Sequence, residues 1–122
     1  DGYEAWILSA FNERDIPIHS VLKEEALNAL NRMKKGVEFL KNDEFARAAF
    51  NVANEALNLN AQWRTSNSLN WRKFQLAFAL STIESAVRTK STERTKLDLL
   101  WVATGGGKTE AYLLISAFVL AH

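Results

Sequence analysis

Three consecutive glycines followed by a lysine and a threonine are the residues of this chain best suited to chemistry. They lie in the stretch ATGGGKTE, residues 103–110. Glycine loses much conformational entropy on folding, so a run of three indicates unusual backbone angles or a bare backbone close to another group. A phosphate is such a group, because successive N–H groups and the positive end of a following helix can surround it. The stretch therefore predicts a phosphate-binding loop.

The residue types in the loop predict how ATP and Mg²⁺ are held. We expect Lys108 to place its charge on the outer phosphates and Thr109 to offer a hydroxyl ligand to Mg²⁺, and we assign the catalytic role to these two side chains. The backbone groups around the phosphates are expected from Thr104, Gly105, Gly106 and Gly107. We interpret Glu110 as a carboxylate that stabilises the first turn of the following helix, not as a catalytic base.

The loop departs from the general pattern G-x-x-x-x-G-K-[ST], because Val102 stands where that pattern has its first glycine. The opposite interpretation is a glycine-rich surface turn with an unrelated lysine. The flanking elements favour the phosphate loop. LDLLWVA, residues 97–103, is short and apolar on both faces, which is typical of a central strand in a parallel sheet, and the apolar residues after the loop predict a helix. A strand, a loop and a helix in that order indicate an α/β protein.

A parallel strand needs neighbouring strands and long crossover connections. No second convincing strand occurs in this sequence, and a lone strand that is apolar on both faces would expose its edges. The chain also begins at Asp1 rather than at a methionine and ends in apolar residues without a helix stop signal. We therefore expect a piece of a longer α/β protein, mostly helical itself, with one central parallel strand.

The residues before this strand predict helices. Apolar residues recur every three or four positions over 20–40 and again over 43–59, and KNDEF between them supplies a turn with a cap at Asn42 or Asp43. We expect these two helices to form an antiparallel hairpin. Their facing apolar residues are predicted to be Leu22, Ala26, Leu30, Met33, Val37 and Leu40 in the first helix and Phe45, Ala48, Ala49, Val52, Ala56 and Leu59 in the second.

Three further segments complete the chain up to the strand. Residues 60–70 are polar and indicate a loop anchored by Trp63, residues 71–88 predict a third helix, and residues 89–96 indicate a charged connector. That connector and its flank hold the basic residues Arg88, Lys90, Arg94 and Lys96. These could contact a DNA phosphate, although such connectors are more often only solvated. The four tryptophans are expected to be packing anchors rather than platforms for bases.

Composition excludes several classes of site. The 122 residues carry a net charge of +1 and no cysteine, so disulfides and thiolate metal sites are excluded. His19 and His122 are the only histidines and lie far apart in sequence, which makes a histidine metal site improbable. Neither a secretory signal nor an apolar run long enough for a membrane span is present, so we expect a soluble, cytoplasmic protein.

Two stretches resemble superfamily 2 helicase-like ATPases of bacterial phage defence, of the DISARM type: WRKFQLAFAL, residues 71–80, and LDLLWVATGGGKTEAYL, residues 97–113. Such proteins have W-R-x-F-Q-L-A-F and later L-W-F-P-T-G-G-G-K-T-E-A-Y-L, and Val102 and Ala103 stand here in place of phenylalanine and proline. The resemblance implies that residues 63–122 begin a RecA-like ATPase lobe through its motif I and that residues 1–62 form a helical accessory region. It also implies ATP-driven movement on DNA and a partner defence protein.

The resemblance assigns further residues to nucleotide binding. In superfamily 2 proteins a glutamine upstream of motif I reads adenine, with its amide acting as both donor and acceptor, and an aromatic or basic neighbour often assists. Gln75, with Phe74 and Arg72, fits that role here. The resemblance also implies an acidic motif II and an arginine finger, which this stretch lacks. Since phosphoryl transfer depends on positioning all of these groups, we expect the chain alone not to hydrolyse ATP.

Two other functions stay open at this point. One is a different class of P-loop ATPase, which the missing first glycine and the upstream Gln75 disfavour. The other is a non-enzymatic helical interaction module, because Gly36, Phe39 and Ala48 have the spacing of one tetratricopeptide unit. A stable array of such units needs about three repeats, and only one is visible.

Overall fold

Residues 2–10 and 17–122 are described by the structure, a computed structural model. They form five α-helices and one short 3₁₀ turn. The helices are α1 (Gly2–Ala10), α2 (Pro17–Asn42), α3 (Glu44–Thr65), α4 (Lys73–Val87) and α5 (Lys108–Ala121), and the 3₁₀ turn η1 (Thr92–Thr95) lies between α4 and α5. No helix of these residues combines the length and the apolar character that crossing a bilayer requires.

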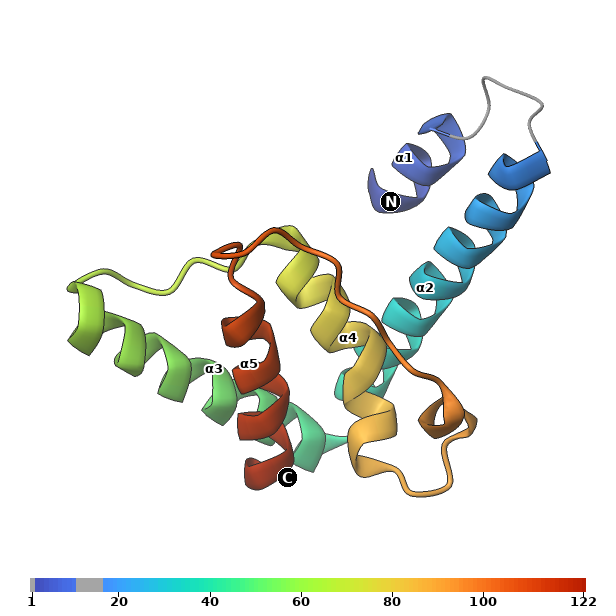
Figure 1. Cartoon of the computed structure of the whole chain (residues 1–122). Coiled ribbons are helices and arrows are strands. Elements are labelled where there is room, and N and C mark those ends of the chain that lie inside the picture. Colours follow the sequence, from blue (N-terminus) through green and yellow to red (C-terminus); the bar gives the residue numbers. More distant parts are fainter. Residues whose placement is uncertain (1, 11–16) are drawn as a thin grey trace.

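The turn between α2 and α3 is a single residue, Asp43. Its carboxylate accepts a hydrogen bond from the Ala46 N–H at 3.0 Å, and its own N–H donates to the Phe39 carbonyl at 3.0 Å. Asp43 thus ends one helix and caps the next, which confirms the predicted cap. Figure 1 shows α3 turning away from α2 instead of running back along it, so the expected antiparallel hairpin is an open corner.

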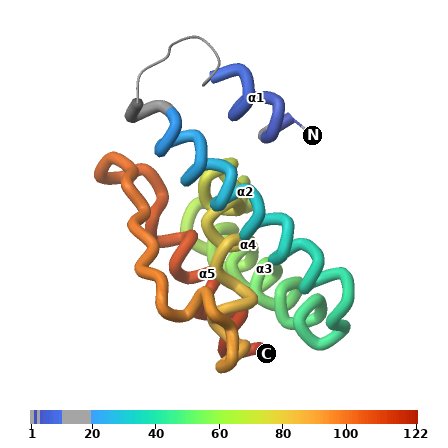
Figure 2. The backbone as a smooth tube through the Cα atoms, turned by 90° about the vertical axis from the view of Figure 1, so that its right-hand side faces the viewer, coloured from blue at the N-terminus to red at the C-terminus, as the bar shows by residue number. Residues whose placement is uncertain are grey.

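The helices pack across the predicted boundary near residue 62. α2 packs on α4, α3 packs on α5, and α4 lies against α5 (Figures 1 and 2). α2 and α4 approach so closely at Gly36 that a Cβ there would lie 1.8 Å from the Leu80 carbonyl oxygen. The shared core contains Phe39, Ala46, Ala49, Ala53, Ala79, Ile83, Leu114 and Phe118. The division into an accessory region and an ATPase part remains a prediction, while helices from both sides share one core.

The buried face of α3 differs from the predicted one. The structure buries Ala46, Ala49 and Ala53, whereas Phe45 is 82% exposed and Val52 is 56% exposed. Small side chains let α5 come close to the α3 backbone, so the alanine stripe takes the core position and the larger residues face outward. Only Ala49 of the predicted α3 face lies in the core.

α3 also extends further than predicted and includes Trp63 in its last turns. The helix ends where Ser66 adopts φ 59° and donates its N–H to the Gln62 carbonyl at 2.9 Å. Trp63 is exposed and therefore does not anchor the chain. Of the tryptophans, Trp71 packs against the core and donates its indole N–H to Asn54 Oδ1 at 2.8 Å, while Trp6, Trp63 and Trp101 are exposed.

The predicted central strand, residues 97–103, is not a strand. The described residues contain no sheet, and this extended segment runs back beside α4 without pairing with another strand (Figure 1). A strand is defined by hydrogen bonds to a neighbour, and no described segment supplies them. Leu97 is 97% exposed, Leu99 is 81% exposed and Trp101 is 88% exposed, so one side of the segment faces outward. The α/β class is therefore wrong for this chain, which is all-α.

Candidate phosphate-binding site

A pocket of about 520 Å³ lies between the start of α4 and the loop that leads into α5. Its lining residues are Leu69, Asn70, Arg72, Gln75, Thr104, Gly105, Gly107, Lys108, Thr109 and Glu110. The pocket therefore brings together the predicted nucleotide-binding residues from two separate parts of the sequence. Two of them do not line it: Gly106, and Phe74, which is partly buried on α4.

The glycines of the loop are required by its geometry. Gly105 has φ 77° and Gly107 has φ 91°, in the left-handed region that side chains disfavour. The Gly106 N–H donates to the Ala103 carbonyl at 2.9 Å and so closes a tight turn. A Cβ at Gly107 would lie 2.7 Å from Gln75 Nε2, and one at Gly106 would lie 2.5 Å from Val102 Cγ1. The loop is thus a packed turn, with backbone angles and close contacts that only glycine meets.

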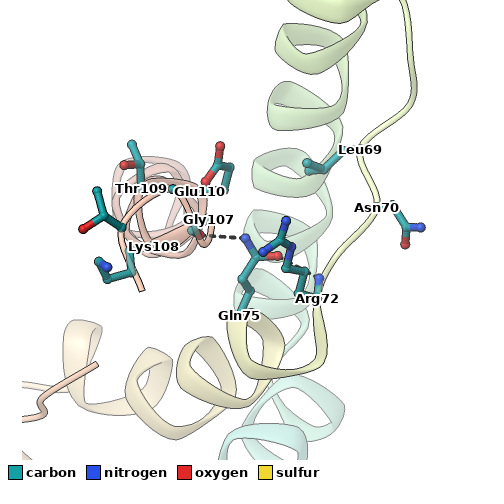
Figure 3. A pocket seen from close by; sticks show the side chains of 10 residues that line it. Leu69, Asn70, Arg72, Gln75, Gly107, Lys108, Thr109 and Glu110 are labelled. Carbon is teal, nitrogen blue, oxygen red and sulfur yellow. Dashed lines mark hydrogen bonds between the residues drawn. The ribbon is translucent and has the colours of Figure 1, made fainter. Parts of the chain in front are cut away.

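Gln75 holds this loop from the first turn of α4. Its side chain is buried, with the residue only 4% exposed. Its Oε1 accepts the Arg72 N–H at 2.7 Å, and its Nε2 donates to the Gly107 carbonyl at 2.7 Å (dashed line in Figure 3). Arg72 adds a second tie, because its Nη1 donates to the Gly106 carbonyl at 2.8 Å. Two successive carbonyls of the loop are therefore bound by α4.

The amide of Gln75 keeps unused hydrogen-bonding capacity. A carboxamide offers two N–H donors and two acceptor lone pairs, and one of each is used here. A base could engage the remaining donor and acceptor, so the predicted adenine contact is compatible with the hydrogen bonds seen. The sequence identified Gln75 as a binding residue but not as a residue that holds the loop. No sequence pattern indicates that its amide donates to the Gly107 carbonyl.

Lys108 is folded back on the loop. Its Nζ donates to the carbonyls of Val102 and Ala103, the second at 3.1 Å. Figure 3 shows its side chain directed away from Gln75. No carboxylate of the described residues forms an ion pair with Lys108 or with Arg72. The ammonium group is thus held by neutral oxygens, which an anion could replace.

The start of α5 adds further positive potential. Gly107 is its N-cap and supplies no side-chain cap, so the first N–H groups of the helix lack a side-chain acceptor at this end. Thr109 is exposed at the pocket and Glu110 lies in the first helical turn, as predicted. Glu110 is the one carboxylate that lines the pocket, against the two cations Arg72 and Lys108. The arrangement favours an anion.

A cluster of charged residues fixes the segment that precedes the loop, and sequence reasoning did not find it. Arg32 of α2 forms a two-pronged contact with Asp98, at 2.5 and 2.7 Å, and its Nε lies 3.2 Å from Glu93 Oε2. Lys96 lies 2.8 Å from Glu93 and Lys35 lies 3.8 Å from it. We call these five residues the charge cluster.

The electrostatics of the charge cluster keep its members ionised. The hydrogen bond from Arg32 lowers the pKa of Asp98 and, in return, raises the pKa of Arg32. The close contact with the Lys96 ammonium group is the main cause that lowers the pKa of Glu93. These shifts oppose the desolvation that partial burial imposes on the charged forms. The ion pairs therefore persist throughout the neutral range of pH.

The predicted basic cluster is largely engaged within the chain. Arg88 pairs with Glu84 at 3.0 Å and lies over the ring of Phe39, 4.6 Å from its centroid. Arg94 Nη1 donates to the Ser85 carbonyl at 2.9 Å, near the end of α4. Since Lys96 belongs to the charge cluster, three of the four basic residues have partners inside the molecule.

Comparison with known proteins gives one relative. No model of a known protein family matches the chain, and no solved structure matches it. The chain is similar to DISARM protein DrmA of Bacillus paralicheniformis, with 36% identity over 146 residues that include 98% of this chain. It spans 12% of the length of that relative. The chain is therefore related to one segment of a much longer DISARM protein.

Proposed function

We propose, from this relationship to a DISARM protein and from the geometry of the pocket, that the chain is the ATP-binding part of a phage-defence ATPase. The whole protein would be a superfamily 2 helicase or translocase that moves on DNA and acts with a partner defence protein. The observation that carries the proposal is the convergence of Lys108, Arg72 and the uncapped start of α5 around a glycine loop.

The residues of the pocket fit the phosphates of a nucleotide. Lys108 would exchange the carbonyls of Val102 and Ala103 for phosphate oxygens, which make shorter and stronger charge-assisted hydrogen bonds. The free N–H groups at the start of α5 would hold the same anion. The pocket volume of about 520 Å³ lies within the usual range of small-molecule sites, about 300–1,000 Å³.

Mg²⁺ would reach Thr109 together with the phosphates. The described residues contain no group of three acidic or histidine side chains that could hold a metal ion. Mg²⁺ commonly binds with few protein ligands and retains waters and phosphate oxygens, so a single hydroxyl is a sufficient protein contribution at this stage. Hydrolysis needs further groups, and the chain by itself is proposed to bind nucleotide weakly and not to turn it over.

A Lys108→Ala substitution in the intact protein that carries this chain tests the proposal. We expect ATP turnover, measured as phosphate release, to be abolished. The affinity for MgATP should fall about 10- to 100-fold because a charge-assisted hydrogen bond is lost. Helix content by circular dichroism should be unchanged. Lys90→Ala is the matched control, since it removes the same charge from an exposed residue that does not line the site. Wild-type turnover in Lys108→Ala, or equal losses in both variants, would contradict the assignment.

A second candidate, a helical interaction module, is favoured by the outer face of α3. Phe45, Val52 and Trp63 are all exposed there, as an apolar surface separate from the pocket. Lys108→Ala leaves this face untouched. A protein that binds no nucleotide with or without that substitution would leave the interaction module as the better supported function.

A further inference from the structure

The segment between η1 and the loop is attached to the rest of the fold mainly through the charge cluster. Residues 97–103 form no backbone ladder, and Leu97, Leu99 and Trp101 face outward. Asp98 holds this segment by its two-pronged contact with Arg32, a residue 66 positions earlier in the chain. Of the described side chains before the loop, Asp98 is the last in this segment that makes a hydrogen bond.

The segment that Asp98 attaches continues directly into the phosphate-binding loop. Val102 and Ala103, shortly after Asp98, supply the two carbonyls that hold Lys108, and the Ala103 carbonyl also accepts the Gly106 N–H. A shift of the segment at Asp98 would therefore move the oxygens that set the place of the ammonium group and of the turn. The loop is held on its other side by Gln75 and Arg72.

The cluster is built to hold position firmly. The side chains of Arg32 and Glu93 are only 13% and 14% exposed, so their interaction is screened less than that of a surface pair. A guanidinium presents a planar fork that matches a carboxylate and keeps Nε for a second acid. Lysine cannot reproduce this geometry, since it carries a single point charge. The contacts thus require arginine specifically.

We propose that Arg32 is a positioning residue for the phosphate-binding loop, acting through Asp98 on the segment that carries the Val102 and Ala103 carbonyls. Arg32 itself lies on α2 and does not line the pocket. The expected effect of Arg32 on nucleotide affinity rests on the proposed function, whereas its effect on the geometry of the loop does not.

Arg32→Lys and Asp98→Asn test this inference by two readouts. In the 122-residue chain, hydrogen exchange of the Gly106 amide, the loop N–H that is hydrogen-bonded to the Ala103 carbonyl, should become about tenfold faster in both variants, because the loop loses one of its attachments. In the intact protein, the dissociation constant of a non-hydrolysable ATP analogue with Mg²⁺ should rise about tenfold, which corresponds to about 1.4 kcal/mol. The double variant should show no more than the effect of Arg32→Lys alone, since the contact that Asp98→Asn removes is already lost in Arg32→Lys.

The control is Lys34→Gln. Lys34 also lies on α2 and forms an ion pair, with Glu4 at 3.1 Å, and none of the hydrogen bonds and ion pairs of the described residues links it to the segment or the loop. This variant should leave loop exchange and affinity unchanged, even if overall stability falls slightly. A merely structural role for Arg32 would instead accelerate exchange evenly throughout the helices.

The outcomes separate the two claims. Unchanged loop exchange in both Arg32→Lys and Asp98→Asn overturns the positioning role, whatever the affinity does. Faster loop exchange in a protein whose wild type binds no nucleotide upholds the positioning role and refutes the proposed function. If Arg32→Lys fails to fold, Asp98→Asn decides, because it keeps the shape of the side chain and removes only its charge.

Discussion

Residues 97–103 and residues 104–109 are neighbours in the sequence, but they differ in how they are held in the fold. The loop is tied to α4 by Gln75 and Arg72, and its Lys108 binds the last two carbonyls of the segment before it, those of Val102 and Ala103. The segment before it pairs with no neighbouring strand among the described residues, and one of its sides faces outward. A motif whose contacts are local or come from one nearby helix is therefore complete among the described residues. A strand needs other strands as partners, and residues 97–103 form none because the described residues offer no such partner.

The largest loss of stability is expected from a substitution at Gly107, where the loop contacts α4. Gly107→Ala places a Cβ 2.7 Å from Gln75 Nε2 at a residue with φ 91°. The left-handed strain alone should cost about 1–2 kcal/mol, and displacement of Gln75 should add to it. We expect a clear fall in the free energy of unfolding measured by urea denaturation.

Gly105→Ala is the matched control for that change. Gly105 has a similar φ of 77°, but a Cβ there would meet no atom within 4 Å. It should therefore show the strain without the clash. Equal losses in the free energy of unfolding for the two substitutions would mean that the contact with Gln75 does not stabilise the loop. The loop would then not be held more firmly than the segment before it.

The pattern of successes and failures in the sequence analysis follows the same division. The cap at Asp43 was predictable because its contacts lie within four residues along the chain. The assembly of Arg72, Gln75 and the glycine loop into one pocket agrees with the spacing of the two motifs. The buried face of α3 was missed because periodicity favours the largest apolar residues, such as Phe45, whereas close packing of helices selects the alanines. Arg32 was missed because no local pattern links it to Asp98, far away in the sequence.

A smaller effect, on nucleotide affinity, tests whether the attachment of the loop to α4 matters for binding. Gln75→Ala removes the bond to the Gly107 carbonyl and the acceptor of the Arg72 N–H. We expect the affinities for both MgATP and MgGTP in the intact protein to fall, because the loop loses a tie. The loss should be greater for ATP if the spare donor and acceptor of Gln75 read adenine, and isothermal titration with both nucleotides measures the difference. Equal losses would leave Gln75 with the loop-holding role alone, and unchanged affinities would refute both roles.

The smallest effect is expected in the 97–103 segment itself. Trp101 is 88% exposed and Leu99 is 81% exposed, so replacing each by serine removes little buried apolar surface from this chain. Substitutions at such surface positions usually change stability by less than about 0.5 kcal/mol. Chemical denaturation of the chain with Trp101→Ser and Leu99→Ser should therefore reproduce the wild-type midpoint, whereas Ile83→Ser, at a fully buried core position, should lower it strongly. A large loss in the segment variants would show that these side chains are buried in the folded chain. The segment would then be held as firmly as the loop, and the contrast between the two regions would disappear.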